Sequence, residues 1–293
     1  MTGTRARPAG ADPLAAPGGV DAYRPEEMAR LVRDGGPVKA HLDVPTTVVL
    51  GVLAGAFVGL GAAASTAVMT GGTAGYGAVR LAGGVVFATG LVLVLVGGAQ
   101  LSTSNSLLVM AWVSRLVTLR RLLLNWALVW VGNLVGAVAT AVLVLHAGQP
   151  ALADGAVSAS ALVTAAGKLE RDVGQAVLAG VLGNGLVCLA VWLSHSARST
   201  TDRVVAVVGP VVALVLLGVD HAVGTMYHLT AGLLVRDRPE VLAAAGLPPD
   251  ALAPVHLASA VGNLLAVTAG NVVGGGVLVG AVYWFVYLRG RPA

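Results

Sequence analysis

The feature that most constrains this chain is a series of six long apolar segments, which make up most of its 293 residues. A helix needs about 20 apolar residues to cross the hydrocarbon core of a bilayer, and each segment is long enough. The segments run over residues 45–69, 79–117, 122–147, 172–194, 203–235 and 259–288. We therefore expect an all-α membrane protein with six membrane-spanning helices.

The composition supports a membrane protein. The mean hydropathy is +0.84, and 11% of the residues are charged, against about 25% in soluble domains. The 40 glycines indicate helices that pack closely through small residues. The net charge of +4 does not indicate nucleic-acid binding, because Lys and Arg lie mostly at the ends of the apolar segments. Cys188, the single cysteine, is expected to pack inside a helix.

Two of the segments, the second and the fifth, are too long and too polar in the middle to be straight helices. Residues 101–106 interrupt one of them, and residues 218–228, with Asp220 and His221, interrupt the other. Non-helical backbone at membrane depth is tolerated only where it is buried in protein or lines a wet cavity. A turn outside the membrane is the alternative, but neither flank of Asp220-His221 alone makes a full span. Both interruptions are therefore predicted pore elements.

The distribution of Lys and Arg predicts the orientation. Thirteen of these residues lie on the side of the two termini and five lie on the other side. Positive loops stay on the cytoplasmic side, so both termini are expected in the cytoplasm and the spans in the inner (plasma) membrane. Residues 1–20 are rich in Pro, Gly and Ala and lack the apolar core of a signal peptide, so we expect them to form a disordered tail. Residues 21–43 are expected to form a cytoplasmic amphipathic segment, and residues 44–289 a six-span channel domain.

The two halves of the chain share short motifs in the same order. Residues 52–55 and 177–180 both read Val-Leu-Ala-Gly, and residues 132–136 and 270–274 both read Gly-Asn-aliphatic-Val-Gly. Three spans in each half imply two inverted repeats. In such folds the substrate path lies at the repeat interface, with broken helices that contribute polar groups.

The polar residues of the two interruptions are the candidates for a substrate pathway. His221 is a candidate to donate or accept a proton, because histidine has an unperturbed pKa of about 6.5, and Asp220 is expected either to orient it or to cap the helix that follows. Thr103, with Ser102 beside it, offers small neutral donors that suit a passing anion. The alternative is that these hydroxyls only satisfy the backbone of the interruption.

Three further polar positions stand out. Lys168 lies in a predicted loop before the fourth span, where a cation would attract anions. Asn184 lies in the middle of the fourth span and could face the pore. Asn133 and Asn271 are expected to hydrogen-bond across helix contacts. No metal-ligand spacing, phosphate-binding loop or nucleophile–base pair is found, so no metal, cofactor or enzymatic activity is predicted.

The motifs at these positions resemble the formate/nitrite transporter family. The resemblance covers nearly all of the chain from Tyr23 to Leu288, and its motifs are residues 23–27, 36–40, 98–105, 183–192, 198–203, 218–227, 263–264, 270–275 and 283–284. It implies an aquaporin-like fold and a homopentamer in the lipid bilayer, with one pore in each protomer. It also implies His221 as the central proton donor, Thr103 as its partner across the pore, Lys168 as the outer anion attractor, and Asn184 as a polar group nearby.

The resemblance further implies two apolar constrictions. The residues expected on the outer side are Phe87, Val187 and Leu214, and those on the inner side are Leu91 and Leu101. Three positions depart from the usual pattern of the family. Ser102 stands where Phe is usual, Asp220 where Glu is usual, and Thr225 where Asn is common. These departures leave the substrate and the gating open.

The predicted function is a channel or transporter for a small monovalent weak-acid anion that is protonated near His221, with formate or nitrite as the leading substrates. Hydrosulfide, acetate and lactate fit the same mechanism. A neutral-solute pore of the water or glycerol type and a non-transporting scaffold are the rivals. The sequence does not decide the direction of flux, or whether the N-terminal segment gates the pore.

Overall fold

In the computed structural model, which describes residues 22–290, every regular element is a helix. The elements are α1 (Pro25–Ala40), α2 (Val44–Met69), α3 (Tyr76–Gly97), η1 (Ser104–Leu108), α4 (Val109–Val113), α5 (Leu119–His146), η2 (Gln149–Ala151), α6 (Ala156–Leu169), α7 (Val173–Ser194), α8 (Thr200–Leu217), α9 (Ala222–Val235), α10 (Pro239–Ala245), α11 (Pro249–Leu252), α12 (Leu257–Asn271), the π-helix η3 (Val272–Ala281) and α13 (Val282–Tyr287). The predicted tail of residues 1–20 lies outside the described residues.

Six helices are long and apolar enough to cross a membrane, which confirms the expected number. They are α2, α3, α5, α7, α8 and the continuous helix Leu257–Tyr287. Side-chain caps fix where some of them begin. At the start of α2, Asp43 accepts a hydrogen bond from the Thr46 N–H, and at the start of α7, Asp172 and Gln175 form a capping box.

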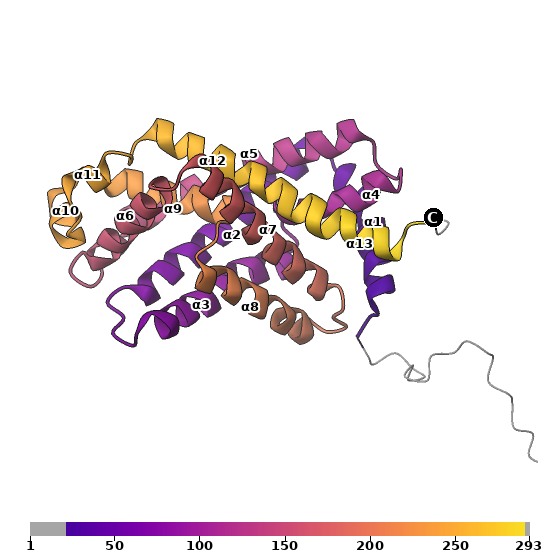
Figure 1. Ribbon diagram of the computed structural model, residues 1–293, viewed down its shortest axis with the longest axis horizontal. Helices are drawn as coiled ribbons and strands as arrows, with labels where there is room; N and C mark the ends of the chain where they lie inside the picture. The colour runs from indigo at the N-terminus through magenta and orange to yellow at the C-terminus, as the bar shows by residue number, and fades with distance from the viewer. Residues whose placement is uncertain (1–21, 291–293) are drawn as a thin grey trace, which may run out of the picture.

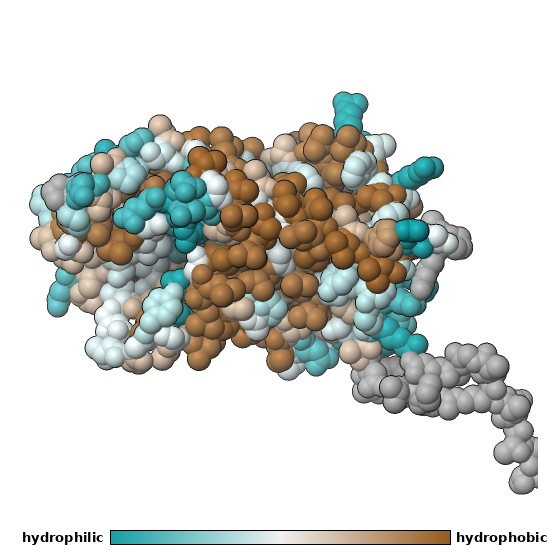
Figure 2. Space-filling model, in the orientation of Figure 1, coloured by the Kyte–Doolittle hydropathy of each residue, from teal (hydrophilic) through white to brown (hydrophobic). Residues whose placement is uncertain are grey.

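The molecule has two polar ends and an apolar middle. Helices α6, α10 and α11 gather at one end, and α1, α4 and α13 at the other (Figure 1). We call these the α6 end and the α1 end. The surface between them is largely hydrophobic, whereas hydrophilic residues gather towards both ends (Figure 2). An apolar surface of this size is unfavourable in water and favourable in hydrocarbon, so the fold is that of a multi-pass membrane protein.

The chain leaves the helical path twice within the predicted spans. Helix α3 ends at Gly97, well before the predicted end of its segment, and α8 ends at Leu217, before α9 begins. The next residues, Gly98 (φ 79°) and Gly218 (φ 64°), adopt the left-handed conformation that glycine takes without strain. We call residues 98–103 and 218–221 the first and second interruptions; the sequence predicted them at 101–106 and 218–228, but residues 104–106 and 222–228 are helical.

One region was predicted wrongly. The segment that includes Lys168 was expected to be a loop, but residues 156–169 form helix α6. Its Leu162 and Ala166 pack with Val235 and Val241 in a small apolar cluster at the α6 end. Packing against the end of α9 therefore stabilises a helix that is too short to be recognised as a span.

Candidate functional site

The two interruptions meet in the protein interior at Thr103 and His221. Thr103 Oγ1 lies 2.7 Å from His221 Nε2, and the two residues are 3% and 5% exposed. They are 118 positions apart in the sequence. The fold thus brings together the two side chains that sequence analysis placed on opposite sides of a pathway.

The other ring nitrogen of His221 fixes the tautomer. His221 is the N-cap of α9, and its Nδ1 accepts a hydrogen bond from the Gly224 N–H at 3.1 Å. A backbone N–H can only donate, so Nδ1 carries no hydrogen and a neutral ring carries its proton on Nε2. Nε2 then donates to Thr103 Oγ1, and the hydrogen of the Thr103 hydroxyl is free for another acceptor.

Asp220 has a different role from the two expected. It does not cap α9, because His221 does so. Its fully buried carboxylate instead forms ion pairs with Lys168 and Arg171, and Arg171 also donates to the carbonyl of Gly218 at 2.7 Å. A buried carboxylate is tolerated when it is paired and hydrogen-bonded in this way. The cluster holds the second interruption against the end of α6.

Lys168 is therefore not a free cation at a loop tip. It lies in the last turn of α6 with its ammonium group on Asp220, and its carbonyl accepts a hydrogen bond from Asn263 at 3.0 Å. With Arg171, two cations face one carboxylate. The cluster consequently keeps an excess positive charge that an anion would sense.

Asn184, in the middle of α7, joins the first interruption to the end of α12. It is fully buried, and its Nδ2 lies 2.7 Å from the Asn271 carbonyl and 3.3 Å from the Thr103 carbonyl. A third contact, to Ser106 Oγ, measures 3.1 Å. The side chain thus holds backbone in place rather than facing open space.

A cavity of about 350 Å³, which we call the vestibule, opens at the α6 end and reaches His221. It lies among α2, α3, α6, α8 and α9, and its polar lining includes Arg80, Lys168, Arg171, His221, Thr225 and His228. The lining carries more basic than acidic side chains. It therefore suits an anion more than a cation.

A much smaller apolar cavity, of about 10 Å³, lies beside His221. It has room for about one water molecule. Its lining includes four of the five predicted constriction residues: Phe87, Leu91, Val187 and Leu214. Leu91 thus lies with the other three and not apart from them. Leu101, the fifth, is fully buried in the same apolar core.

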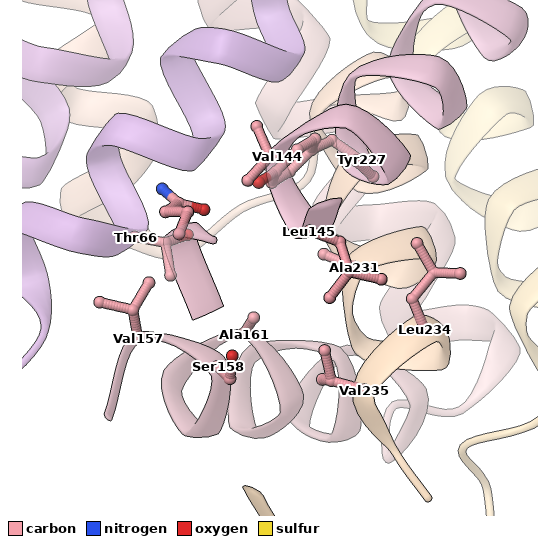
Figure 3. A pocket seen from close by; sticks show the side chains of 12 residues that line it. Thr66, Val144, Leu145, Val157, Ser158, Ala161, Tyr227, Ala231, Leu234 and Val235 are labelled. Atoms are coloured by element: carbon pink, nitrogen blue, oxygen red, sulfur yellow. The ribbon is translucent and has the colours of Figure 1, made fainter. Parts of the chain in front are cut away.

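His221 does not line two other cavities, although its partner Thr103 lines the second of them. One, of about 30 Å³, lies between α2, α5, α6 and α9, with Thr66, Tyr227 and Val235 around it (Figure 3). The other, of about 330 Å³, is almost wholly apolar and lies against α5 and α12. Ser102 lines this second cavity, and its N–H donates to Asn133 Oδ1 at 2.8 Å. Among the described residues no His, Cys, Asp and Glu cluster could hold a metal ion.

Residues 26–285 match the family described as formate/nitrite transporter. The chain belongs to this family. The formate channel FocA of Escherichia coli strain K12 is 37% identical over 273 residues, which are 92% of this chain and 96% of FocA. A probable formate transporter of Methanothermobacter thermautotrophicus is 31% identical, over 90% of this chain and 97% of that protein.

Solved channel structures share the fold. A pentameric formate channel with formate bound aligns with a TM-score of 0.75 and 32% identity, over 84% of this chain and 98% of that one. An FNT family ion channel aligns with a TM-score of 0.76 and 25% identity, over 89% of this chain and 98% of that one. These relatives are channels and transporters, not enzymes.

Sequence reasoning missed Arg171 and a second polar cluster at the α1 end. There the Asn105 amide donates to Gln100 Oε1 (2.6 Å) and Asn125 Oδ1 (2.9 Å), and its own oxygen accepts from Lys39 Nζ at 3.2 Å. Lys39 is half-buried, and burial lowers its pKa. Amide side chains within otherwise apolar segments could have indicated this cluster from the sequence. For Arg171 the signal was its position three residues after Lys168.

Proposed function

We propose that this chain forms a channel for small monovalent weak-acid anions, with formate or nitrite as substrate. The proposed assembly is a homopentamer with one pore in each protomer and the α1 end in the cytoplasm of a plasma-membrane protein. Residues 21–43 would form the cytoplasmic segment and residues 44–289 the channel, built as inverted three-helix repeats whose second and fifth spans are broken. Family membership and the pentameric formate channel with the same fold support this proposal.

The observation that carries the proposal is the Thr103–His221 pair beside the small apolar cavity. A bare anion in such a passage pays a large desolvation penalty, because an apolar lining offers no hydrogen bonds. A protonated weak acid is neutral and avoids most of this penalty. His221 lines both the polar vestibule and the apolar cavity, so it lies where a proton must be gained.

The hydrogen bonds suggest how the anion is received. The His221 Nε2–H donates to Thr103 Oγ1, which leaves the hydrogen of the Thr103 hydroxyl free for an anion oxygen that reaches the pair. The anion then takes a proton that the water in the vestibule relays from the bulk solution, so that no hydroxide is left behind, and it continues as the neutral acid. A donor role for the ring itself would need a second ring proton on Nδ1, which the Gly224 N–H blocks. We therefore propose that His221 holds Thr103 in its donating orientation.

Hydrosulfide, acetate and lactate would pass by the same steps and are the alternatives within this mechanism. A neutral-solute pore is the alternative outside it. The basic lining of the vestibule favours an anionic substrate, because the positive charges of Lys168 and Arg171 attract an anion and not a neutral solute.

The test is stopped-flow uptake into proteoliposomes of formate, nitrite, hydrosulfide, acetate, lactate and glycerol at about pH 5.5 and about pH 7.5, with empty liposomes as control. The expected result is uptake of formate or nitrite well above the control and faster at the lower pH. Uptake of glycerol or water with no anion flux at either pH would replace this proposal with the neutral pore.

A further inference from the structure

Arg80 is a cation in the vestibule for which the proposed pathway has no role. Near the start of α3 it reaches across to the second interruption, with Nη2 3.0 Å from the position that a Cβ on Gly218 would occupy. Lys168 and Arg171 share the carboxylate of Asp220, but no Asp or Glu among the described residues pairs with Arg80. Its guanidinium group instead lies 5.6 Å from the centre of the Tyr76 ring.

Three of the side chains that line the vestibule each contain a buried polar atom that has no hydrogen-bond partner among the described residues. These atoms are Arg80 Nε, Thr225 Oγ1 and His228 Nδ1. Thr225 is only 1% exposed. A buried polar group without a partner is unfavourable, and such groups in native proteins are usually satisfied by water or by a ligand. Three of them on one cavity indicate something that occupies it.

The three side chains continue the pathway away from His221. Thr225 and His228 follow His221 by four and seven positions on α9, so all three lie on one helix face. With a rise of about 1.5 Å per residue, Thr225 lies about 6 Å and His228 about 10 Å further along the helix axis. His228, Thr225 and His221 therefore follow one another from the open end of the vestibule to the Thr103–His221 pair.

The donor set indicates the ligand. A guanidinium edge presents two parallel N–H groups, which match the two oxygens of a planar anion. The Thr225 hydroxyl adds a third donor, and the His228 ring adds a donor or an acceptor. Formate and nitrite are planar and have two oxygens, whereas hydrosulfide has a single acceptor atom and cannot use both N–H groups.

We propose that Arg80, Thr225 and His228 form a second anion-binding site in the vestibule, which takes a planar two-oxygen anion such as formate or nitrite before it reaches Thr103 and His221. This inference rests on the proposed function, because the ligand is the transported anion. It adds a residue that discriminates among substrates, since the guanidinium fork favours two-oxygen anions over hydrosulfide.

Two measurements on the purified full-length protein test the site: the formate concentration that gives half-maximal uptake, and the rise of melting temperature with added formate. Arg80→Lys keeps the charge and removes the planar fork, and Thr225→Val removes only the hydroxyl. Each change should raise the half-maximal concentration about five- to tenfold, as expected for one lost charge-assisted hydrogen bond, and weaken the formate-dependent rise in melting temperature. Thr225→Ser keeps the hydroxyl and should behave like the original protein.

Arg238→Lys is the matched control, because Arg238 precedes α10 and does not line the vestibule. Unchanged half-maximal concentrations and melting shifts in both test variants would overturn the site, as would an equal loss in Thr225→Ser or Arg238→Lys. An equal change for hydrosulfide in Arg80→Lys would overturn the claim for two-oxygen anions. If the original protein moves no formate, the proposed function fails, and the formate-dependent melting shift still decides whether the site exists.

Discussion

Asn133 and Asn271 make equivalent sets of three hydrogen bonds, Asn133 at the first interruption and Asn271 at the second. Asn133 Nδ2 donates to the carbonyls of Gly51 and Gln100, at 2.8 and 2.9 Å. Its Oδ1 accepts from the Ser102 N–H at 2.8 Å. One side chain thus ties α2 to two residues of the first interruption.

Asn271 repeats this arrangement at the second interruption. Its Nδ2 donates to the carbonyls of Gly180 and Asp220, at 2.8 and 3.2 Å, and its Oδ1 accepts from the Ala222 N–H at 2.8 Å. Both amides satisfy backbone that a helix would otherwise satisfy, which is a requirement within a membrane.

Asn271→Asp should destabilise the protein. The aspartate can still accept from the Ala222 N–H, but it cannot donate to the carbonyls of Gly180 and Asp220. A buried group left without a partner costs about 1–3 kcal/mol. We expect a lower melting temperature in detergent, whereas Thr89→Val, which removes an exposed hydroxyl bonded within its own helix, should leave it nearly unchanged. Equal melting temperatures for both variants would contradict the bracing role of Asn271.

Gly183 should not tolerate a methyl group. A Cβ there would overlap the carbonyl oxygen of Asp220, so the second interruption would have to move away from α7. Gly183→Ala should therefore lower both the melting temperature and the flux. Gly185→Ala, two residues further along the same helix, meets nothing within 4 Å and should be tolerated. Full activity of Gly183→Ala, measured by formate uptake, would show that the contact is not required.

His221→Asn should reduce flux without abolishing its dependence on pH. Asparagine is a good N-cap and can accept from the Gly224 N–H in place of Nδ1. The variant loses the donor to Thr103, so uptake should slow, while the proton still comes from water. Stopped-flow uptake over a range of pH checks this. A profile that becomes flat would instead identify the ring as the source of the proton.

Asp220→Asn should be more damaging than Lys168→Met. The asparagine leaves Lys168 and Arg171 without their shared carboxylate, and breaking a largely buried pair costs up to about 3 kcal/mol. Lys168→Met leaves Asp220 paired with Arg171 and should mainly slow anion uptake. Melting temperature and flux, measured side by side, separate the two effects. The reverse order of stability would mean that Lys168 alone holds Asp220.

We expect the protein to lose stability at acid pH because of His195. It follows α7 at the α1 end, where burial lowers its pKa below the usual 6.5 and outweighs the hydrogen bond to the Val191 carbonyl. The unfolded chain then binds a proton more readily than the folded one, so stability falls as pH drops below about 6.5. His195→Gln should reduce the difference in melting temperature between about pH 7.5 and about pH 5.5. An unchanged difference would assign the pH response to other groups.

Local sequence signals predicted the spans and the polar positions of the interruptions. Long apolar segments need no tertiary information, and glycines such as Gly98 and Gly218 mark where a helix stops. The pairing of Asp220 could not be predicted, because its partner Lys168 lies 52 positions away on a helix that was expected to be a loop. Helix α6 forms through packing against the end of α9, which no pattern within the segment reveals.

The constriction residues show the same limit. All five were named through the family resemblance, but only the fold places Leu91 in the same cavity as Phe87 and Leu214. The tautomer of His221 likewise depends on the start of α9, which the sequence analysis did not assign to His221.

The amide of Asn184 has a consequence for the kinetics of transport. It bonds the backbone at Thr103 and at Asn271, and the Asn271 side chain in turn bonds Asp220, so the two interruptions are linked through these two asparagines. An alternating-access cycle, in which one half rocks against the other, would have to break this link at every turnover. A permanent link of this kind favours passage by diffusion through a pore. The flux should then rise only weakly with temperature, and its maximum should not be limited by a slow conformational cycle.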